Sequence, residues 1–164
     1  MGGCMKHYVI FDLDGTLADG RHRLHLLPTK DYDKTESWTE FNLAAVDDLP
    51  FLDNIALCNI FLNAGHHVVI LTGRSDVARE VTEYWLDEFC VGHDELVMRK
   101  QSDNRKDTVI KEEYLRSIGL ENILCCFDDL PHVAYHLRSL GLTCHLVTHY
   151  EEQRTDLVSH GDDE

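Results

Sequence analysis

Two carboxylates with one residue between them, Asp12 and Asp14, end an apolar run near the start of the chain. The run, residues 6–11, predicts a buried strand, and Gly15 follows the second acid at once. Ligands and reactive groups gather at the carboxyl ends of strands in open α/β sheets. Because two acids this close repel each other, we expect a divalent cation or a shared proton between them. The alternative is a strand that ends in a simple Asx turn, with Gly15 supplying positive φ.

Polar residues also follow two later apolar runs, 67–71 and 122–127. The first run is followed by a hydroxyl, a glycine and an arginine, and the second by two acids: Thr72, Gly73, Arg74, Asp128 and Asp129. A basic segment, 105–111, opens a helix between the last two strands. If the strands are parallel and adjacent, all these groups meet at one edge of the sheet.

This set of side chains is suited to chemistry on a phosphoryl group. Four carboxylates without a convergent His or Cys form a hard oxygen site for magnesium, whereas zinc prefers nitrogen or sulfur. The Thr72 hydroxyl and the Gly73 amide can donate hydrogen bonds to phosphoryl oxygens, and a lysine can neutralise their charge. A carboxylate can then attack phosphorus, and the aspartyl phosphate divides one hydrolysis into two in-line displacements.

Composition limits the class of protein. A length of 164 residues predicts one domain, and a net charge of −15 argues against binding to an extended duplex or an anionic membrane. No apolar run is long enough for a membrane span, and residues 1–6 do not have the hydrophobic region that we expect of a signal peptide. None of the six cysteines forms a Cys-x-x-Cys pair, so we expect a reduced, cytoplasmic protein. The adjacent Cys125 and Cys126 would point to opposite faces of a strand.

The basic residues are unevenly distributed on this acidic chain. Six of them lie close together in sequence: Arg99, Lys100, Arg105, Lys106, Lys111 and Arg116. A local positive patch suits a small anionic target better than a long duplex. The alternative is an ordinary solvated helix face.

Alternating strands and helices predict an α/β fold, a doubly wound parallel sheet with helices on both faces. The expected strands are 6–11, 67–71, 95–98, 122–127 and 143–147. The expected helices are 51–64, 75–89, 107–118 and 131–140. The polar stretch 18–50 predicts an irregular insertion with one or two short helices, in place of a large cap. One domain would cover residues 1–148, followed by an acidic, mobile tail over 149–164.

The motifs, in this order, resemble those of the haloacid dehalogenase superfamily of phosphatases. They are Asp-Leu-Asp-Gly-Thr (12–16), Leu-Thr-Gly-Arg (71–74), a lysine and Phe-Asp-Asp (127–129). The resemblance spans residues 6 to about 148. It is closest to the 3′-phosphatase domain of phage polynucleotide kinase, because Arg-Lys-Asp (105–107) precedes Val-Ile-Lys-Glu-Glu (109–113). Since no Gly-x-x-x-x-Gly-Lys-Ser/Thr loop is present, we expect a phosphatase domain without a kinase domain.

The resemblance implies that four acids hold magnesium and carry the reaction. Asp12 would attack phosphorus and bind the metal. Asp14 would protonate the leaving alkoxide, then deprotonate water, and touch the metal through its backbone carbonyl. Asp128 and Asp129 would anchor the metal. To donate a proton, Asp14 must be protonated when substrate is bound, so we expect a raised pKa for this carboxyl.

The other implied residues surround the phosphoryl group. Thr72 and Gly73 would hold it, and Lys111 would neutralise it, with Lys106 as the second candidate for that role. The remaining contacts implied on the substrate side are Arg74, either Arg21 or Arg23, and Asp107, which would orient Lys111 or an arginine.

We therefore expect a magnesium-dependent phosphomonoesterase that removes phosphate from nucleic-acid 3′ ends or nucleotides through an aspartyl phosphate. The short insertion leaves an open site that admits a polymer end, whereas the net acidity favours a free nucleoside monophosphate. The first alternative is thus a phosphatase of small nucleotides only. A second alternative, of another class, is a phosphoacceptor signalling module, in which the phosphorylated Asp stands alone on a later strand.

Overall fold

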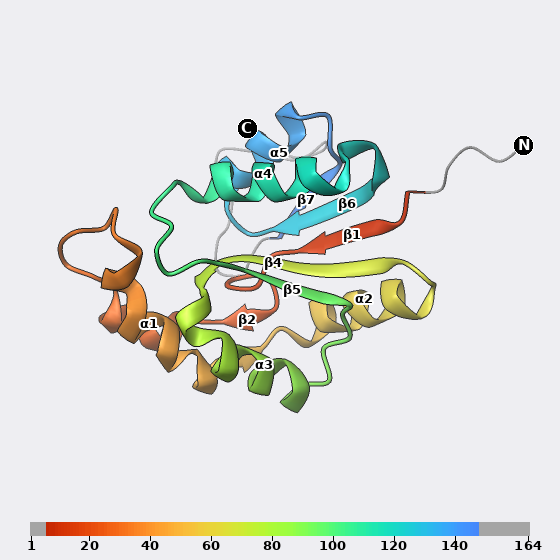
Figure 1. Ribbon diagram of the computed structural model, residues 1–164. Helices are drawn as coiled ribbons and strands as arrows, with labels where there is room; N and C mark the ends of the chain where they lie inside the picture. Colours follow the sequence, from red (N-terminus) through yellow and green to blue (C-terminus); the bar gives the residue numbers. More distant parts are fainter. Residues whose placement is uncertain (1–5, 148–164) are drawn as a thin grey trace, which may run out of the picture.

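The computed structural model describes residues 6–147 and places five parallel strands in one sheet (Figure 1). In sequence order the strands are β1 (Tyr8–Phe11), β4 (His67–Ser75), β5 (Glu95–Arg99), β6 (Ile123–Asp128) and β7 (Cys144–Leu146). They lie side by side in the order β5-β4-β1-β6-β7. The predicted parallel sheet is confirmed, while the acidic segment 149–164 lies outside the described residues.

Helices cover both faces of this sheet (Figure 1). On one face lie α2 (Leu52–Asn63) and α3 (Arg79–Glu88), and on the other lie α4 (Asp107–Ile118) and α5 (Pro131–Ser139). Alternate residues of β1 enter the two cores, because side chains alternate along a strand. Phe11 packs in the core of the first face, and Ile10 packs in the core of the second. The doubly wound arrangement predicted from the sequence is therefore present.

The site is positioned by the central place of β1. Phe11, its last residue, pairs with Ile70 of β4 and with Phe127 of β6. The residue after Phe11, Asp12, is therefore level with the carboxyl end of β6 and with the end of the apolar run of β4 at Leu71. Asp128, the last residue of β6, reaches the same edge.

The helix boundaries follow the sequence signals closely. The helix α4 spans the predicted residues 107–118, and Pro131 occupies the first turn of α5, where its missing N–H costs nothing. The Ser75 side chain accepts a hydrogen bond from the Val77 N–H, as expected of a cap, but the first turn is the short 3₁₀ helix η4 (Asp76–Ala78). A further 3₁₀ turn, η5 (Leu120–Asn122), leads into β6.

The strand β4 is longer than predicted. The apolar run ends at Leu71, yet β4 continues to Ser75, which pairs with Arg99 of β5 after a register shift. The Arg99 Nε donates a hydrogen bond of 2.9 Å to the Gly73 carbonyl, so this side chain supports the extension. The polar residues of the second motif therefore lie within the strand.

The insertion at 18–50 is small, as predicted. Its ends form a two-stranded antiparallel ribbon, β2 (Ala18–Asp19) with β3 (Leu49–Pro50). Between these strands lie four short elements: η1 (Arg21–Leu26), η2 (Thr35–Trp38), α1 (Thr39–Leu43) and η3 (Ala44–Asp47). None of the helices within residues 6–147 has the length and hydrophobicity needed to cross a membrane.

The insertion is joined to the loop between β5 and α4 by hydrogen bonds. The Thr35 N–H donates to Asn104 Oδ1 at 2.8 Å, and the Thr35 hydroxyl donates to the Asp103 carbonyl at 2.5 Å. The Gln101 Nε2 donates to Thr39 Oγ1 at 3.1 Å. These contacts fix the insertion against the body of the domain.

Candidate active site

A buried lysine links acids from three elements at the carboxyl edge of the sheet. The Nζ of Lys111, on α4, lies 3.1 Å from Asp12 Oδ1 and 2.7 Å from Asp128 Oδ2. It also lies 3.3 Å from Asp107 Oδ2. Burial alone would lower the pKa of Lys111, but the carboxylates of Asp12, Asp107 and Asp128 raise it well above its usual value. Lys111 therefore carries a permanent positive charge beside Asp12.

Three of the predicted metal ligands lie together. Asp12, Asp128 and Asp129 each offer a carboxylate oxygen, and these oxygens lie within 4.8 Å of one another. Asp129 Oδ1 is buried and has no hydrogen-bond partner among the described residues. Burial raises the pKa of both Asp12 and Asp129, and the charge of Asp128 raises them further. A cluster of crowded carboxylates with an unsatisfied oxygen is what a hard divalent cation such as Mg²⁺ would fit.

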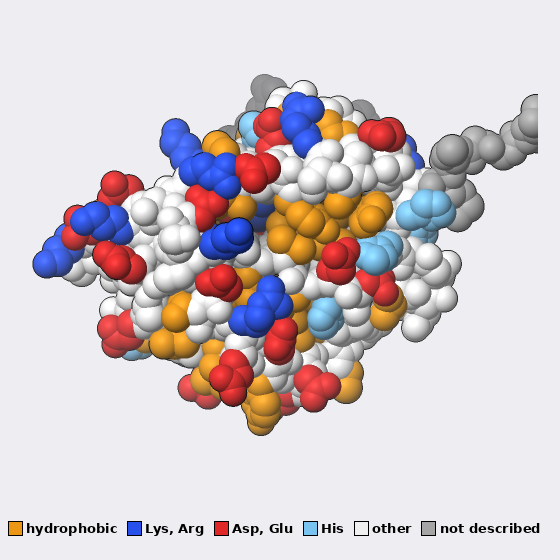
Figure 2. Space-filling view, in the orientation of Figure 1, with side chains coloured by type: hydrophobic (Ala, Val, Ile, Leu, Met, Phe, Trp, Pro, Cys, Tyr) orange, Lys and Arg blue, Asp and Glu red, His pale blue; other side chains and the backbone are white. Residues whose placement is uncertain are grey.

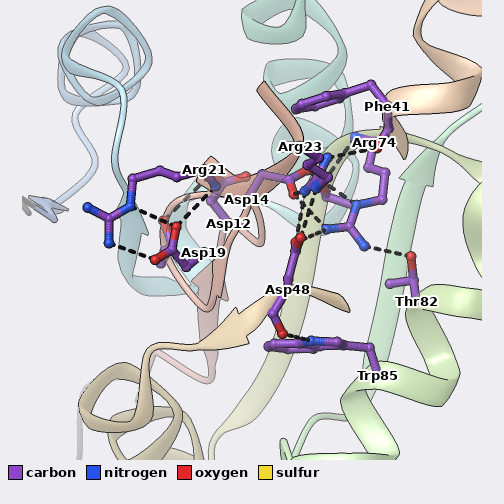
Figure 3. A network of polar contacts seen from close by, with 12 residues as sticks. Asp12, Asp14, Asp19, Arg21, Arg23, Phe41, Asp48, Arg74, Thr82 and Trp85 are labelled. Atoms are coloured by element: carbon purple, nitrogen blue, oxygen red, sulfur yellow. Dashed lines mark hydrogen bonds and ion pairs between the residues drawn. The ribbon is translucent and has the colours of Figure 1, made fainter. Parts of the chain in front are cut away.

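The fourth predicted ligand, Asp14, points its side chain elsewhere (Figure 3). Its Oδ1 accepts hydrogen bonds from Arg23 Nη2 at 2.5 Å and from Arg74 Nη2 at 2.6 Å. Burial would raise the pKa of Asp14, but Arg74 and Arg23 lower it to about 2. In the free site two guanidinium groups therefore stabilise the ionised carboxylate. The raised pKa that we expect with substrate bound stays a prediction. The contribution of its backbone carbonyl to a metal site stays a prediction.

The structure separates the two candidate arginines. Arg23 is fully buried, donates from Nη1 to the Phe41 carbonyl at 3.1 Å, and stacks with its guanidinium carbon 4.2 Å from the centre of the Phe41 ring. Arg21 is half-exposed and donates to Asp19 at 2.9 and 2.7 Å (Figure 3). Of the two, Arg23 is therefore the one in contact with Asp14.

A cavity of about 820 Å³ opens over these residues. All the predicted site residues line it except Lys111 and Asp128, which are buried next to Asp12: Asp12, Asp14, Arg21, Arg23, Thr72, Gly73, Arg74, Lys106, Asp107 and Asp129. Four aromatic side chains add an apolar wall: Tyr32, Trp38, Phe41 and Phe51. The cavity thus combines a charged floor with flat apolar surfaces.

Backbone from β4 reaches close to the acids. Gly73 leaves no room for a side chain, because a Cβ there would collide with Asp107. The Thr72 hydroxyl accepts a hydrogen bond of 3.0 Å from the Arg74 N–H, and this bond fixes the orientation of the Thr72 side chain. Both residues line the cavity beside the acids.

The predicted basic cluster at 99–116 does not form one positive patch. Lys111 is buried among acids, Arg116 pairs with Glu112 at 3.0 Å, and Arg105 pairs with both Asp103 and Glu113. Figure 2 shows Lys and Arg side chains next to Asp and Glu side chains on the face of the molecule that carries α4. The alternative of a solvated helix face describes these residues better, because acidic residues of the same segment pair with Arg105 and Arg116.

Sequence reasoning also missed Asp48 and Thr82, which hold the arginines. Arg23 Nε donates to Asp48 Oδ1 at 2.8 Å, and Arg74 Nη1 donates to Thr82 Oγ1 at 2.9 Å. Neither residue belongs to a motif. Asp48 stands in a polar insertion among many other acids, so nothing in the sequence singled it out.

Comparison with known proteins gives a family and several structures of similar fold. A family profile described as "Polynucleotide kinase PNKP phosphatase domain" matches residues 6–151. Among solved structures, a chain of a Pnkp1/Rnl/Hen1 complex is 27% identical with a TM-score of 0.73, and covers 90% of this chain and 47% of that chain. A chain of a Pnkp1/Rnl/Hen1 RNA repair complex is 30% identical with a TM-score of 0.68, with 87% and 42% covered. The present chain thus spans less than half the length of these two relatives.

A more distant structure shows the same fold. It is a haloacid dehalogenase family enzyme from Bacteroides thetaiotaomicron, in complex with magnesium and inorganic phosphate. It is 10% identical with a TM-score of 0.57, and the match covers 92% of this chain and 98% of that chain. The family match over most of the chain decides the assignment. The protein belongs to the polynucleotide kinase phosphatase-domain family of the haloacid dehalogenase superfamily, and is a phosphoric monoester hydrolase.

Proposed function

We propose that the protein is a magnesium-dependent phosphatase that removes the terminal phosphate from nucleic-acid 3′ ends through an aspartyl phosphate on Asp12. The observation that carries the proposal is the contact of Lys111 Nζ with both Asp12 and Asp128 at the strand edge. It supports the proposal because a buried ammonium group lies beside the carboxylate that would act as the nucleophile, and this carboxylate lines the cavity. Membership in a phosphatase family excludes the signalling-module alternative.

The residues present divide the reaction into two displacements. Asp12 attacks phosphorus while Asp14 gives a proton to the departing ester oxygen. Asp14 then takes a proton from the water that attacks the aspartyl phosphate, and inorganic phosphate leaves with Asp12 regenerated. Lys111, the Thr72 hydroxyl and the Gly73 N–H stabilise the charge on the transferring oxygens. Mg²⁺, held by Asp12, Asp128 and Asp129, would offset the remaining negative charge at this end of the sheet.

Asp14 must be protonated in order to donate, and we propose that binding of the substrate favours this protonation. In the free site Arg23 and Arg74 hold the pKa of Asp14 down to about 2. A phosphate monoester brings a second anion next to Asp14, and its negative charge raises the pKa of this carboxyl. In the proposed reaction, bound substrate therefore favours the protonated form of Asp14.

The aromatic wall of the cavity supports a nucleotide end as the substrate. Tyr32 is 64% exposed, and the Trp38 and Phe41 rings meet edge to face with their centres 5.9 Å apart. Flat apolar side chains beside a phosphate site are suited to stacking with bases. The small insertion leaves the cavity open, which admits a strand longer than one nucleotide.

A free nucleoside monophosphate is the second candidate substrate. The net charge of −15 and the paired basic residues around the cavity offer little attraction to a long polyanion. Both candidates share the same chemistry at phosphorus. They differ only in how much of the nucleic acid the protein contacts.

Phosphate release from matched substrates distinguishes the candidates. One oligonucleotide is prepared with a 3′-phosphate or a 5′-phosphate, and is compared with the corresponding free mononucleotides, with Mg²⁺ and with EDTA. We expect the 3′-phosphorylated oligonucleotide to have the highest kcat/KM, and EDTA to abolish release. Asp12→Asn should be inactive with an unchanged circular dichroism spectrum. Faster turnover of the free mononucleotides would favour the second candidate, and activity in Asp12→Asn would remove the nucleophile.

A further inference from the structure

Asp48 is a buried carboxylate outside every phosphatase motif, and it binds the arginine next to Asp14 (Figure 3). Asp48 is only 2% exposed to solvent. Arg23 Nε donates to its Oδ1 at 2.8 Å, and Arg23 Nη2 donates to its Oδ2 at 2.9 Å. Such a two-point contact fixes the plane of the guanidinium group as well as its place.

The same carboxylate reaches further partners. The Oδ2 of Asp48 lies 3.6 Å from Arg74 Nη2, and its Oδ1 lies 2.7 Å from the Nε2 of His22. The backbone carbonyl of Asp48 accepts a hydrogen bond of 2.8 Å from the indole N–H of Trp85, which is buried in the core. Asp48 is therefore tied to the rigid interior through its backbone, while its carboxylate faces the arginines.

The arginines connect Asp48 to Asp14. The Nη2 groups of Arg23 and Arg74 converge on one oxygen, Asp14 Oδ1, from the side where Asp48 lies (Figure 3). Two cations alternate with two anions, so each buried charge has an opposite neighbour. Without Asp48, Arg23 would keep Asp14 and the Phe41 carbonyl as partners but lose its two-point contact.

We infer that Asp48 is a positioning residue, which holds Arg23 and Arg74 so that they orient the Asp14 carboxyl toward the departing oxygen. The inference rests on the proposed function, in which Asp14 gives that proton. Asp48 itself does not line the cavity in which the substrate would bind.

The inference predicts an effect that depends on the leaving group. An alkoxide, such as the 3′ oxygen of a nucleoside, needs a proton as it departs, whereas the phenolate of p-nitrophenyl phosphate does not. A displacement of about 1 Å at a catalytic group can cost roughly a hundredfold in rate. Loss of Asp48 should therefore slow the alkyl ester and leave the aryl ester almost unaffected.

The experiment compares kcat/KM for a 3′-phosphorylated oligonucleotide and for p-nitrophenyl phosphate in wild type and Asp48→Asn. We expect the ratio of the two values to fall by about tenfold to a hundredfold in the variant. Glu112→Gln is the matched control, because Glu112 also accepts an arginine, Arg116 Nε at 3.0 Å, and a histidine, His136 Nε2 at 2.7 Å. It lies outside the cavity lining, so its ratio should equal that of wild type.

The ratio of kcat/KM for the two substrates distinguishes a positioning role of Asp48 from a role in the stability of the fold alone. Both substrates are measured on one preparation, so a lower folded fraction cancels from the ratio. A ratio unchanged in Asp48→Asn would overturn the inference and leave Asp48 a purely structural role. If that variant yields no folded protein, Asp48→Glu, which keeps the charge but displaces it by one methylene, should show the same fall.

Failure of the proposed function would look different. A wild-type protein that hydrolyses neither ester, or only the aryl ester, contradicts the assignment of Asp14 as proton donor. A wild type active on both esters with an unchanged ratio in the Asp48 variants contradicts only the positioning role.

Discussion

At the scale of single residues, the ammonium group of Lys111 is the positive charge that contacts three carboxylates of the site. This group lies within 3.3 Å of carboxylates from the end of β1, the start of α4 and the end of β6. Breaking a buried ion pair by removing one partner costs roughly 3–5 kcal/mol, because the other charge is left uncompensated. The same ammonium lies where negative charge would gather on a transferring phosphoryl group.

Lys111→Ala should therefore lose activity and stability together. We expect kcat to fall about a hundredfold or more, as for the loss of one transition-state donor, with a lower melting temperature that Mg²⁺ partly restores. Steady-state kinetics and thermal unfolding with and without Mg²⁺ measure both effects. Lys100→Ala, at an exposed position, is the control. A comparable loss of kcat in Lys106→Ala, with Lys111→Ala active, would transfer the role to Lys106.

At this scale the sequence predicted residues that belong to local motifs and missed those defined by distant contacts. Asp12, Asp128 and Lys111 stand at the ends of apolar runs or in a helix of recognisable pattern, so their positions follow from local rules. Asp48 gains its importance from Arg23, 25 residues away, and from a buried Trp85. Such a pairing depends on how the insertion folds back, which residue types alone do not specify.

At the scale of elements, two turns bring the acids together. The turn after β1 contains Gly15, with a φ of +79°, and its N–H donates to the Ala18 carbonyl at 2.9 Å. A Cβ on Gly15 would overlap the carboxylate of Asp129, which follows β6. The two turns are thus packed in direct contact, and the spacing of the acids depends on the absence of one side chain.

Gly15→Ala should weaken the metal site by displacing Asp129. A non-glycine residue at positive φ costs roughly 1–2 kcal/mol, and we expect the displaced carboxylate to add a weakening of Mg²⁺ binding of about tenfold or more. Gly141→Ala is the matched control, because Gly141 has a φ of +88° with no atom within 4 Å of its added Cβ. Isothermal titration calorimetry with Mg²⁺ should give a weaker affinity for Gly15→Ala than for Gly141→Ala. Equal Mg²⁺ affinities in the two variants would contradict the role given to Gly15.

Some element boundaries were predictable from the sequence, such as the end of α4, which Gly119 follows. The limits of α4 agree with the prediction, whereas β4 runs four residues beyond the apolar run, from Leu71 to Ser75. That extension depends on the Arg99 side chain of the neighbouring strand, which binds the Gly73 carbonyl. Cross-strand support of this kind is invisible in a hydrophobic pattern.

At the scale of the whole molecule, the sheet divides the interior into two cores. Cys125 packs in the core with α2 and α3, and Cys126 packs in the core with α4 and α5, as their adjacency in a strand predicted. Burial raises the pKa of Cys58 to about 12, and raises the pKa of Cys125 and of Cys144 to about 11. The thiolate form of these groups is therefore scarce until the pH approaches those values.

Alkylation should report this protection residue by residue. At pH 8 we expect iodoacetamide to modify the exposed Cys90 in the native protein, while Cys58, Cys125 and Cys144 stay unmodified until urea unfolds the chain. Raising the pH toward 11 should increase labelling of the buried thiols, because deprotonation then becomes favourable. Peptide mass spectrometry identifies each site. Native labelling of Cys58 as fast as that of Cys90 would contradict the packed core.

The insertion held by Thr35 and Gln101 has a consequence for the catalytic cycle. Since both its ends already join in a ribbon and its middle is bonded to the opposite loop, it acts as a fixed wall. If the substrate is a nucleic-acid end, as we propose, it would enter and leave the cavity without a domain-closing motion.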